Sequence, residues 1–155
     1  MASLVADTTA AEVPSGVLFV DDEPDNIRII VDILKDALDE RVDAAHSVED
    51  AVELLLARPY RLVVMDVFIP LGEHPNRVLG PRADKVQEHV DHLGGLVLLE
   101  EIDRLDPRPT VMAHTACTDH ALLEIFGDRV VHRIPKPAPL DTLLRDVVDT
   151  LRSLD

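Results

Sequence analysis

Short runs of aliphatic residues recur along the chain, and several of them end at an acidic or hydroxyl residue. The run Val17–Val20 ends at Asp21 and Asp22, and the run 62–65 ends at Asp66. A short continuous apolar run between turn signals is typical of a strand that is buried on both faces. Further runs predict strands at 42–45, 110–114 and 130–134.

The segments between these runs carry apolar residues at steps of three and four, which is the spacing of one helical face. Pro24 suits the first turn of a helix over residues 24–39. Ser47, with Asp50 three residues later, is close to a capping box and predicts a helix that ends before Pro59. Further helices are predicted over 96–105, 119–126 and 140–154.

Strands that alternate with helices predict an α/β fold. Parallel strands need crossover connections, and right-handed crossovers place helices on both faces of the sheet. We therefore expect a doubly wound, five-stranded parallel sheet with helices on both faces. In such sheets, sites form at the carboxyl ends of the strands. This rule predicts a site that contains the following residues: Asp21, Asp22, Asp66, Thr115 and Lys136.

One stretch of the chain departs from this alternation. Residues 71–93 are polar and contain two prolines, and helical spacing returns only at Val86. We predict that residues 71–93 form an inserted loop and a helix. A chain of 155 residues has the length of one domain. We therefore expect one domain over residues 16–155 and a mobile N-terminal tail over residues 1–15.

Composition and charge exclude several classes of function. The formal net charge is −15 at pH 7, so the molecule as a whole repels nucleic acid and anionic lipid surfaces. No apolar run approaches the roughly 20 residues of a transmembrane helix, and no basic segment typical of a signal peptide opens the sequence. Cys117 is the single cysteine, which excludes an intrachain disulfide and the usual zinc sites. We expect a cytoplasmic protein that binds neither nucleic acid nor membranes.

The aspartates predicted at the sheet edge define the candidate chemistry. Clustered carboxylates raise one another's pKa unless a cation is present, and Mg²⁺ prefers a few carboxylate oxygens with waters and a phosphate. The other interpretation is that Asp21 and Asp22 only cap the following helix. Lys136, between two prolines, would aim its ammonium at the acids, and Thr115 offers a hydroxyl donor. Together these groups describe a site for a phosphoryl group on an aspartate.

Four motifs contain these residues. They are Val-Leu-Phe-Val-Asp-Asp-Glu-Pro at 17–24, Val-Val-Met-Asp-Val-Phe-Ile-Pro at 63–70, Ala-His-Thr-Ala at 113–116 and Pro-Lys-Pro at 135–137. In this order, they resemble the receiver domain of bacterial two-component response regulators. The resemblance implies a flavodoxin-like fold. It also implies a signalling module that receives a phosphoryl group from a sensor histidine kinase or a phosphotransfer protein and then alters its protein contacts.

The resemblance implies that Asp66 is the phosphoacceptor in a Mg²⁺-dependent reaction. Asp22 and Asp66 would bind Mg²⁺ directly, and Asp21 would bind it through water. The main-chain carbonyl of Phe68 would complete the protein's share of the metal ligands. Such a domain is expected to be a phosphoryl acceptor with slow self-dephosphorylation rather than an enzyme.

Two residues near the last strand would bind the phosphoryl group, and one neighbour departs from the family pattern. The resemblance implies that Thr115 and Lys136 contact phosphoryl oxygens and that the peptide bond between Lys136 and Pro137 is cis. Three residues before this lysine, the family usually has an aromatic residue, but here Arg133 follows His132. We expect Arg133 and His132 to lie on an output surface for acidic groups of a partner or of a second copy in a homodimer.

Two other functions compete with this interpretation. The chain could be a receiver-like partner-binding module that is regulated by residues 71–93 rather than by phosphorylation. It could also be a Mg²⁺-dependent phosphohydrolase with an aspartate nucleophile. Enzymes of the haloacid dehalogenase type have a second aspartate two residues after the nucleophile, whereas Phe68 stands two residues after Asp66. This difference disfavours the phosphohydrolase.

Overall fold

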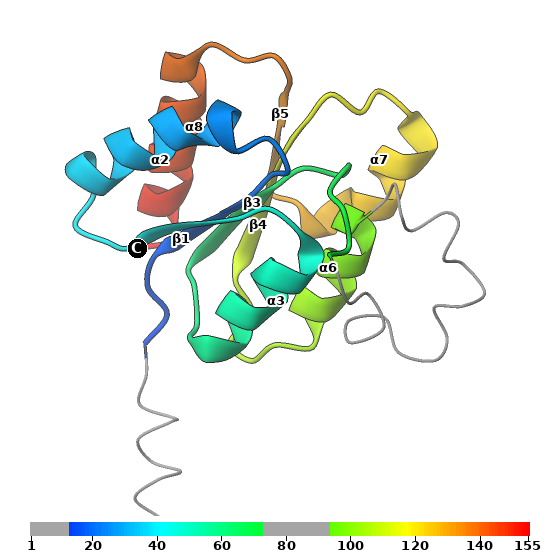
Figure 1. The fold of residues 1–155 in the computed structure, drawn as a ribbon, viewed down its shortest axis with the longest axis horizontal. Coiled ribbons are helices and arrows are strands. Elements are labelled where there is room, and N and C mark those ends of the chain that lie inside the picture. The colour runs from blue at the N-terminus through cyan, green and yellow to red at the C-terminus, as the bar shows by residue number, and fades with distance from the viewer. Residues whose placement is uncertain (1–12, 73–93) are drawn as a thin grey trace, which may run out of the picture.

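The computed structural model describes residues 13–72 and 94–155 (Figure 1). Most of the predicted tail and residues 73–93 of the predicted insertion lie outside the described residues. The described elements are β1 (Val17–Val20), α2 (Pro24–Ala37), β2 (Val42–Ala45), α3 (Val48–Ala57), β3 (Leu62–Met65), α6 (Gly94–Asp103), β4 (Thr110–Thr115), α7 (His120–Phe126), the 3-10 turn η2 (Gly127–Arg129), β5 (His132–Pro135) and α8 (Leu140–Ser153).

The strands form one five-stranded sheet in the order β2-β1-β3-β4-β5, and every neighbouring pair is parallel. Helices α2 and α8 cover one face of the sheet, and α3 and α6 lie on the other (Figure 1). The predicted fold class is therefore confirmed. Strand β1 lies inside the sheet, between β2 and β3, which brings the ends of β1 and β3 side by side.

The hydrophobic core has two parts, one on each face of the sheet. In β1, Leu18 and Val20 pack with the cluster that includes α3 and α6, whereas Val17 and Phe19 pack with the cluster that includes α2 and α8. Successive strand residues point to opposite faces. Because both faces are covered, every residue of β1 and β3 is buried, which explains their continuous apolar runs.

Strand β5 and helix α6 each begin two residues away from the predicted position. Strand β5 begins at His132, because the 3-10 turn η2 follows α7 and its last hydrogen bond joins the Val130 N–H to the Gly127 carbonyl. Helix α6 begins at Gly94, two residues before the apolar face that predicted it. A Cβ atom at Gly94 would overlap the carbonyl oxygen of Ile69, so this close approach of helix and loop needs glycine.

The start of the predicted insertion packs on the domain. Leu71 is buried in the core, and its carbonyl oxygen accepts a hydrogen bond from the N–H of Glu49 at 2.9 Å. The carbonyl oxygen of Pro70 accepts one from the N–H of Val48, also at 2.9 Å. These bonds satisfy free N–H groups in the first turn of α3. Of the helices within the described ranges, none combines the length and the apolar character needed to cross a bilayer.

The register of α2 predicts opposite effects for two adjacent isoleucines. Ile30 is fully buried against the sheet, whereas Ile29 is 57% exposed. Ile30→Ala should lower the free energy of unfolding by about 2–5 kcal/mol through lost burial and a cavity, and Ile29→Ala should change it by less than about 1 kcal/mol. Urea denaturation of both variants measures the difference. Equal losses would show that this face of α2 is not the buried one.

Candidate functional site

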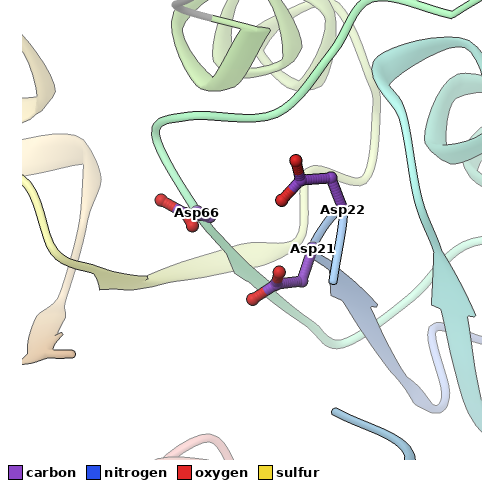
Figure 2. A group of neighbouring side chains, drawn as sticks. All are labelled: Asp21, Asp22 and Asp66. Carbon is purple, nitrogen blue, oxygen red and sulfur yellow. The ribbon is translucent and has the colours of Figure 1, made fainter. Parts of the chain in front are cut away.

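Three aspartates meet at the carboxyl ends of β1 and β3 (Figure 2). Asp21 and Asp22 follow β1, and Asp66 follows β3, as the strand-end rule predicts. Each offers a carboxylate oxygen, and these oxygens all lie within 4.8 Å of one another. Asp21 and Asp66 are buried, and Asp22 is exposed. The cluster therefore has two buried carboxylates and one that is exposed to solvent.

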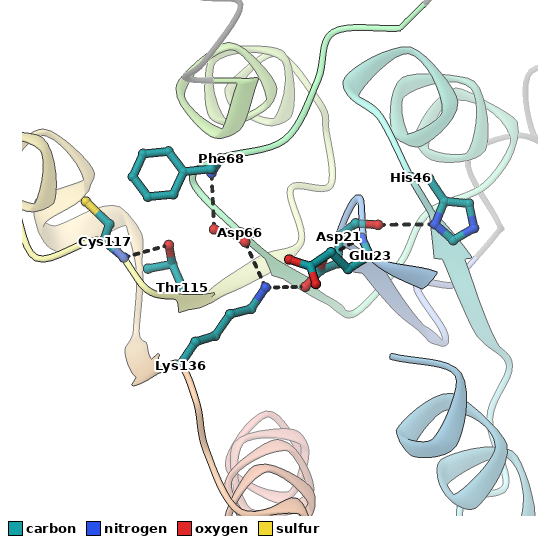
Figure 3. Close-up of polar contacts among 8 residues, drawn as sticks. All are labelled: Asp21, Glu23, His46, Asp66, Phe68, Thr115, Cys117 and Lys136. Carbon is teal, nitrogen blue, oxygen red and sulfur yellow. Dashed lines mark hydrogen bonds and ion pairs between the residues drawn. The ribbon is translucent and has the colours of Figure 1, made fainter. Parts of the chain in front are cut away.

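Lys136 contacts both buried carboxylates (Figure 3). Its Nζ atom donates to Asp21 Oδ2 at 2.7 Å and to Asp66 Oδ2 at 2.8 Å. The lysine side chain is 15% exposed, so the ion pairs are largely shielded from water. Its backbone N–H donates to the Thr115 carbonyl, which anchors the start of the β5–α8 connection on β4. The peptide bond to Pro137 is cis, as the resemblance implies.

Backbone donors complete the surroundings of the two buried carboxylates. Asp66 Oδ1 accepts a hydrogen bond from the N–H of Phe68 at 3.1 Å, and Asp21 Oδ1 accepts one from the N–H of Glu23 at 3.0 Å (Figure 3). His46 follows β2, and its Nδ1 lies 3.1 Å from the carbonyl oxygen of Asp21. The sequence interpretation missed these three contacts. His46 carried a signal, because it stands at the end of a strand next to β1.

The Thr115 hydroxyl lies beside Asp66. Thr115 is 1% exposed, and its Oγ1 accepts a hydrogen bond from the N–H of Cys117 at 3.2 Å (Figure 3). This bond uses the oxygen as an acceptor and leaves the hydroxyl hydrogen to be donated. The structure therefore brings all five residues of the predicted strand-end site together.

The pKa values of Asp66 and Asp22 are shifted in opposite directions. Burial alone would raise the pKa of Asp66, but hydrogen bonds from Lys136, Thr115 and the Phe68 backbone outweigh it and hold that pKa below its ordinary value. Burial, followed by repulsion from Asp21 and Glu23, raises the pKa of Asp22. Carboxylate neighbours therefore raise the pKa of Asp22, as expected. At Asp66 the expected direction is reversed, because the hydrogen bond from Lys136 lowers the pKa.

The surroundings of the site also shift the pKa values of two basic side chains, Lys136 and His114. Burial opposes the charge of Lys136, but its hydrogen bonds to Asp21 and Asp66 outweigh burial and raise the pKa of the lysine. His114, the residue before Thr115, is half-buried. Burial and the charge of Lys136 lower its pKa, which favours the neutral imidazole. Lys136 is therefore the stable cation of this site.

The donor set fits a hard divalent cation. All three side chains offer carboxylate oxygens, which Mg²⁺ prefers, and the exposure of Asp22 leaves room for water ligands. Phe68 directs its backbone N–H to Asp66, and its main-chain carbonyl remains a predicted ligand. His132 and Arg133 are exposed on β5 and are not part of this cluster. His132 lies 3.2 Å from Asp146 of α8.

Comparison with solved structures identifies the fold. A receiver domain protein from Methanospirillum hungatei superposes with a TM-score of 0.67 and 17% identity over 91% of this chain and 96% of the other. The signal receiver domain of an HD domain-containing protein from Pseudomonas fluorescens superposes with a TM-score of 0.67 and 20% identity. This match covers 91% of this chain and 97% of the other. The chain has the fold of a response regulator receiver domain. No protein-family model and no curated protein matches the sequence.

The receiver fold alone does not define the chemistry. A structure described as a redox sensor of streptococci that evolved from two-component response regulators matches with a TM-score of 0.68 and 19% identity. That match covers 90% of this chain and 52% of the other. The function of a receiver fold therefore depends on the residues of its site rather than on its topology.

Removing the ammonium should reverse the pKa shift of Asp66. In Lys136→Met, burial and the neighbouring Asp21 are left without an opposing charge, so the pKa of Asp66 should rise above its ordinary value. In the wild type the lowered pKa stabilises the fold above the pKa of the unfolded carboxyl, and this contribution is lost as pH falls through the folded pKa. NMR titration of the side-chain carboxyl carbons measures the shift.

Lys35→Met is the matched control, because Lys35 is an exposed lysine in the last turn of α2. It should leave the titration of Asp66 unchanged. A pKa of Asp66 that stays low in Lys136→Met would contradict the role assigned to the ammonium.

Proposed function

We propose that this receiver-fold protein is a phosphoacceptor signalling module whose acceptor is Asp66. The observation that carries this proposal is the pairing of one buried, ionised aspartate with a lysine ammonium and a threonine hydroxyl beside two further aspartates. A carboxylate kept ionised is a nucleophile, and the cationic and hydroxyl donors around it can receive the oxygens of a phosphoryl group.

The reaction that follows is transfer from a phosphohistidine to the carboxylate. One oxygen of Asp66 forms a bond to phosphorus, and the bond between phosphorus and the imidazole nitrogen breaks. The electron pair of that bond leaves with the imidazole, which takes up a proton from water. The product is an acyl phosphate on Asp66. Lys136 and Thr115 would then pair with phosphoryl oxygens, so that the ammonium exchanges a carboxylate partner for a phosphoryl partner.

Mg²⁺ would be held by Asp22 and Asp66 directly, by Asp21 through water, and by the main-chain carbonyl of Phe68. When bound, the ion neutralises charge on the transferring group and on the clustered carboxylates. The negative site needs such a cation because Lys136 is the single cationic side chain in contact with the two buried carboxylates, of the residues that the structure describes.

The proposed function requires two protein partners, one that donates the phosphoryl group and one that responds to the phosphorylated protein. The phosphoryl donor would be a sensor histidine kinase or a phosphotransfer protein in the cytoplasm. The output would be a change of protein contacts, for which the exposed residues Arg133 and His132 are our candidate surface, with a homodimer as one form of it. Slow self-dephosphorylation would reset the module. In this function the protein accepts a phosphoryl group and does not catalyse the conversion of a separate substrate.

Phosphorylation of Asp66 can be tested by intact mass. Incubation with acetyl phosphate and Mg²⁺ should add about 80 Da to the wild type. The adduct should be absent in Asp66→Asn and in excess chelator, because both the nucleophile and the cation are required. Asp149→Asn, which replaces an exposed aspartate of α8, should be modified like the wild type.

Other outcomes of this experiment separate the alternatives. An adduct that persists in Asp66→Asn would assign the acceptor elsewhere. No adduct on the wild type would favour a partner-binding module regulated by residues 71–93. Hydrolysis of p-nitrophenyl phosphate that depends on Asp66 would favour the phosphohydrolase.

Mg²⁺ binding should depend on Asp22 and on pH. Asp22→Asn removes one carboxylate ligand and should weaken the affinity by about tenfold or more. Asp36→Asn, at an exposed position of α2, should leave it unchanged. Because the pKa of Asp22 is raised, protons should compete with Mg²⁺ as the pH falls toward that pKa. Calorimetric titration measures both effects, and equal affinities of Asp22→Asn and wild type would exclude Asp22 as a ligand.

A further inference from the structure

The junction between β2 and α3 contacts both loops that carry the aspartates of the site. The carbonyl oxygen of Ala45, the last residue of β2, accepts a hydrogen bond from the N–H of Asp21 at 3.0 Å. Two residues of the first turn of α3 donate their N–H groups to carbonyl oxygens in the loop that follows Asp66. The loops after β1 and β3 are therefore attached to the same short segment, residues 45–49.

His46 is the residue of this junction that contacts the loop after β1 with its side chain. Its Nδ1 lies 3.1 Å from the carbonyl oxygen of Asp21 (Figure 3). A carbonyl oxygen only accepts hydrogen bonds, so this contact requires a hydrogen on Nδ1. The next residue, Ser47, is the N-cap of α3, and the pairing of β1 with β2 ends at Ala45. Within residues 13–72 and 94–155, the imidazole is therefore the donor to this carbonyl in place of a backbone N–H.

This contact acts on the peptide group that joins Asp21 to Asp22. A peptide group is planar, so a hydrogen bond to the carbonyl oxygen of Asp21 also restrains the N–H of Asp22. The plane sets the direction in which the side chain of Asp22 leaves the backbone. Lys136 and the N–H of Glu23 hold the carboxylate of Asp21, whereas the carboxylate of Asp22 is exposed. The position of the exposed carboxylate in the cluster thus depends on how this peptide is held.

We propose that His46 is a positioning residue for the cation site. Its imidazole orients the peptide between Asp21 and Asp22 and thereby sets the affinity for Mg²⁺, while the ligands are the clustered carboxylates, of which His46 is not one. This inference rests on the proposed function, in which Asp22 binds the ion directly. Groups that orient metal ligands change the affinity for the metal when they are removed.

Calorimetric titration of Mg²⁺ into the full chain tests this role. His46→Leu keeps a side chain of similar bulk without a donor and should weaken the affinity about three- to tenfold, the scale of one net hydrogen bond. His46→Asn places an amide N–H close to the position of Nδ1 and should restore the affinity to within about twofold of the wild type. His120→Leu replaces an exposed histidine at the start of α7 and should leave the affinity unchanged.

NMR of the protein without Mg²⁺ tests the contact itself. At about pH 8.5, above the ordinary pKa of imidazole, the ring of His46 should carry its hydrogen on Nδ1. The amide signal of Asp22 should shift in His46→Leu and should stay in place in His120→Leu. Because His46 is exposed, we expect these variants to fold like the wild type.

Three results would overturn the inference alone, in a wild type that binds Mg²⁺. They are equal affinities of His46→Leu and wild type, an affinity of His46→Asn as weak as that of His46→Leu, and a hydrogen on Nε2 of His46 instead of Nδ1. A purely structural contact would give the first result even if His46→Leu lowered the free energy of unfolding. A wild type that binds no Mg²⁺ would overturn this inference together with the proposed metal site.

Discussion

The ammonium of Lys136 holds two buried carboxylates that would otherwise repel each other, and the rest of the site depends on this contact. Asp21, Asp66 and Lys136 lie at the ends of the first, third and last strands. Their meeting requires β1, β3, β4 and β5 to pair in the observed order, because β3 and β4 lie between β1 and β5. A buried ion pair costs desolvation energy, and removing one partner leaves an uncompensated charge. This arrangement is therefore better explained by function than by stability.

The hydrophobic core makes this contact possible. Strands β1 and β3 are buried on both faces, so their carboxyl ends are fixed side by side by packing and by parallel pairing. The aspartates that follow them are thereby fixed before any ligand binds. Loop donors then fix the orientation of the carboxylates, since the N–H groups of Glu23 and Phe68 each hold one oxygen. The free energy gained by packing the core thus stabilises an arrangement of charged groups that these groups would not adopt without it.

Much of this structure could be predicted from the sequence, because the deciding signals are local. Apolar runs identified β1 and β3, and the strand-end rule then grouped Asp21 and Asp66 with Lys136. The start of α6 was not predictable, because Gly94 is required by the carbonyl of Ile69, which contacts it only in the folded chain. The lowered pKa of Asp66 was also missed, since its sign depends on which carboxylates the ammonium reaches.

A pocket of about 260 Å³ between β4, α7 and β5, which Arg133 borders, could not be predicted from the sequence. Its walls combine β4, α7, β5 and the segment after β3, and its volume depends on how these side chains fill the space between elements. From the sequence, Arg133 was a departure from the family pattern and a candidate residue of the output surface. Its lack of a partner within the described part of the chain became visible with the fold.

We propose that Asp66 is held ready for a phosphoryl group by Lys136, Thr115 and a Mg²⁺ site. Beryllium trifluoride has the charge and tetrahedral shape of a phosphoryl group and binds carboxylates. Its binding can be followed by ¹⁹F NMR without a kinase. We expect slowly exchanging bound fluorine signals that require Mg²⁺ and are absent in Asp66→Asn. No bound signal in the wild type, or the same signal in Asp66→Asn, would contradict it.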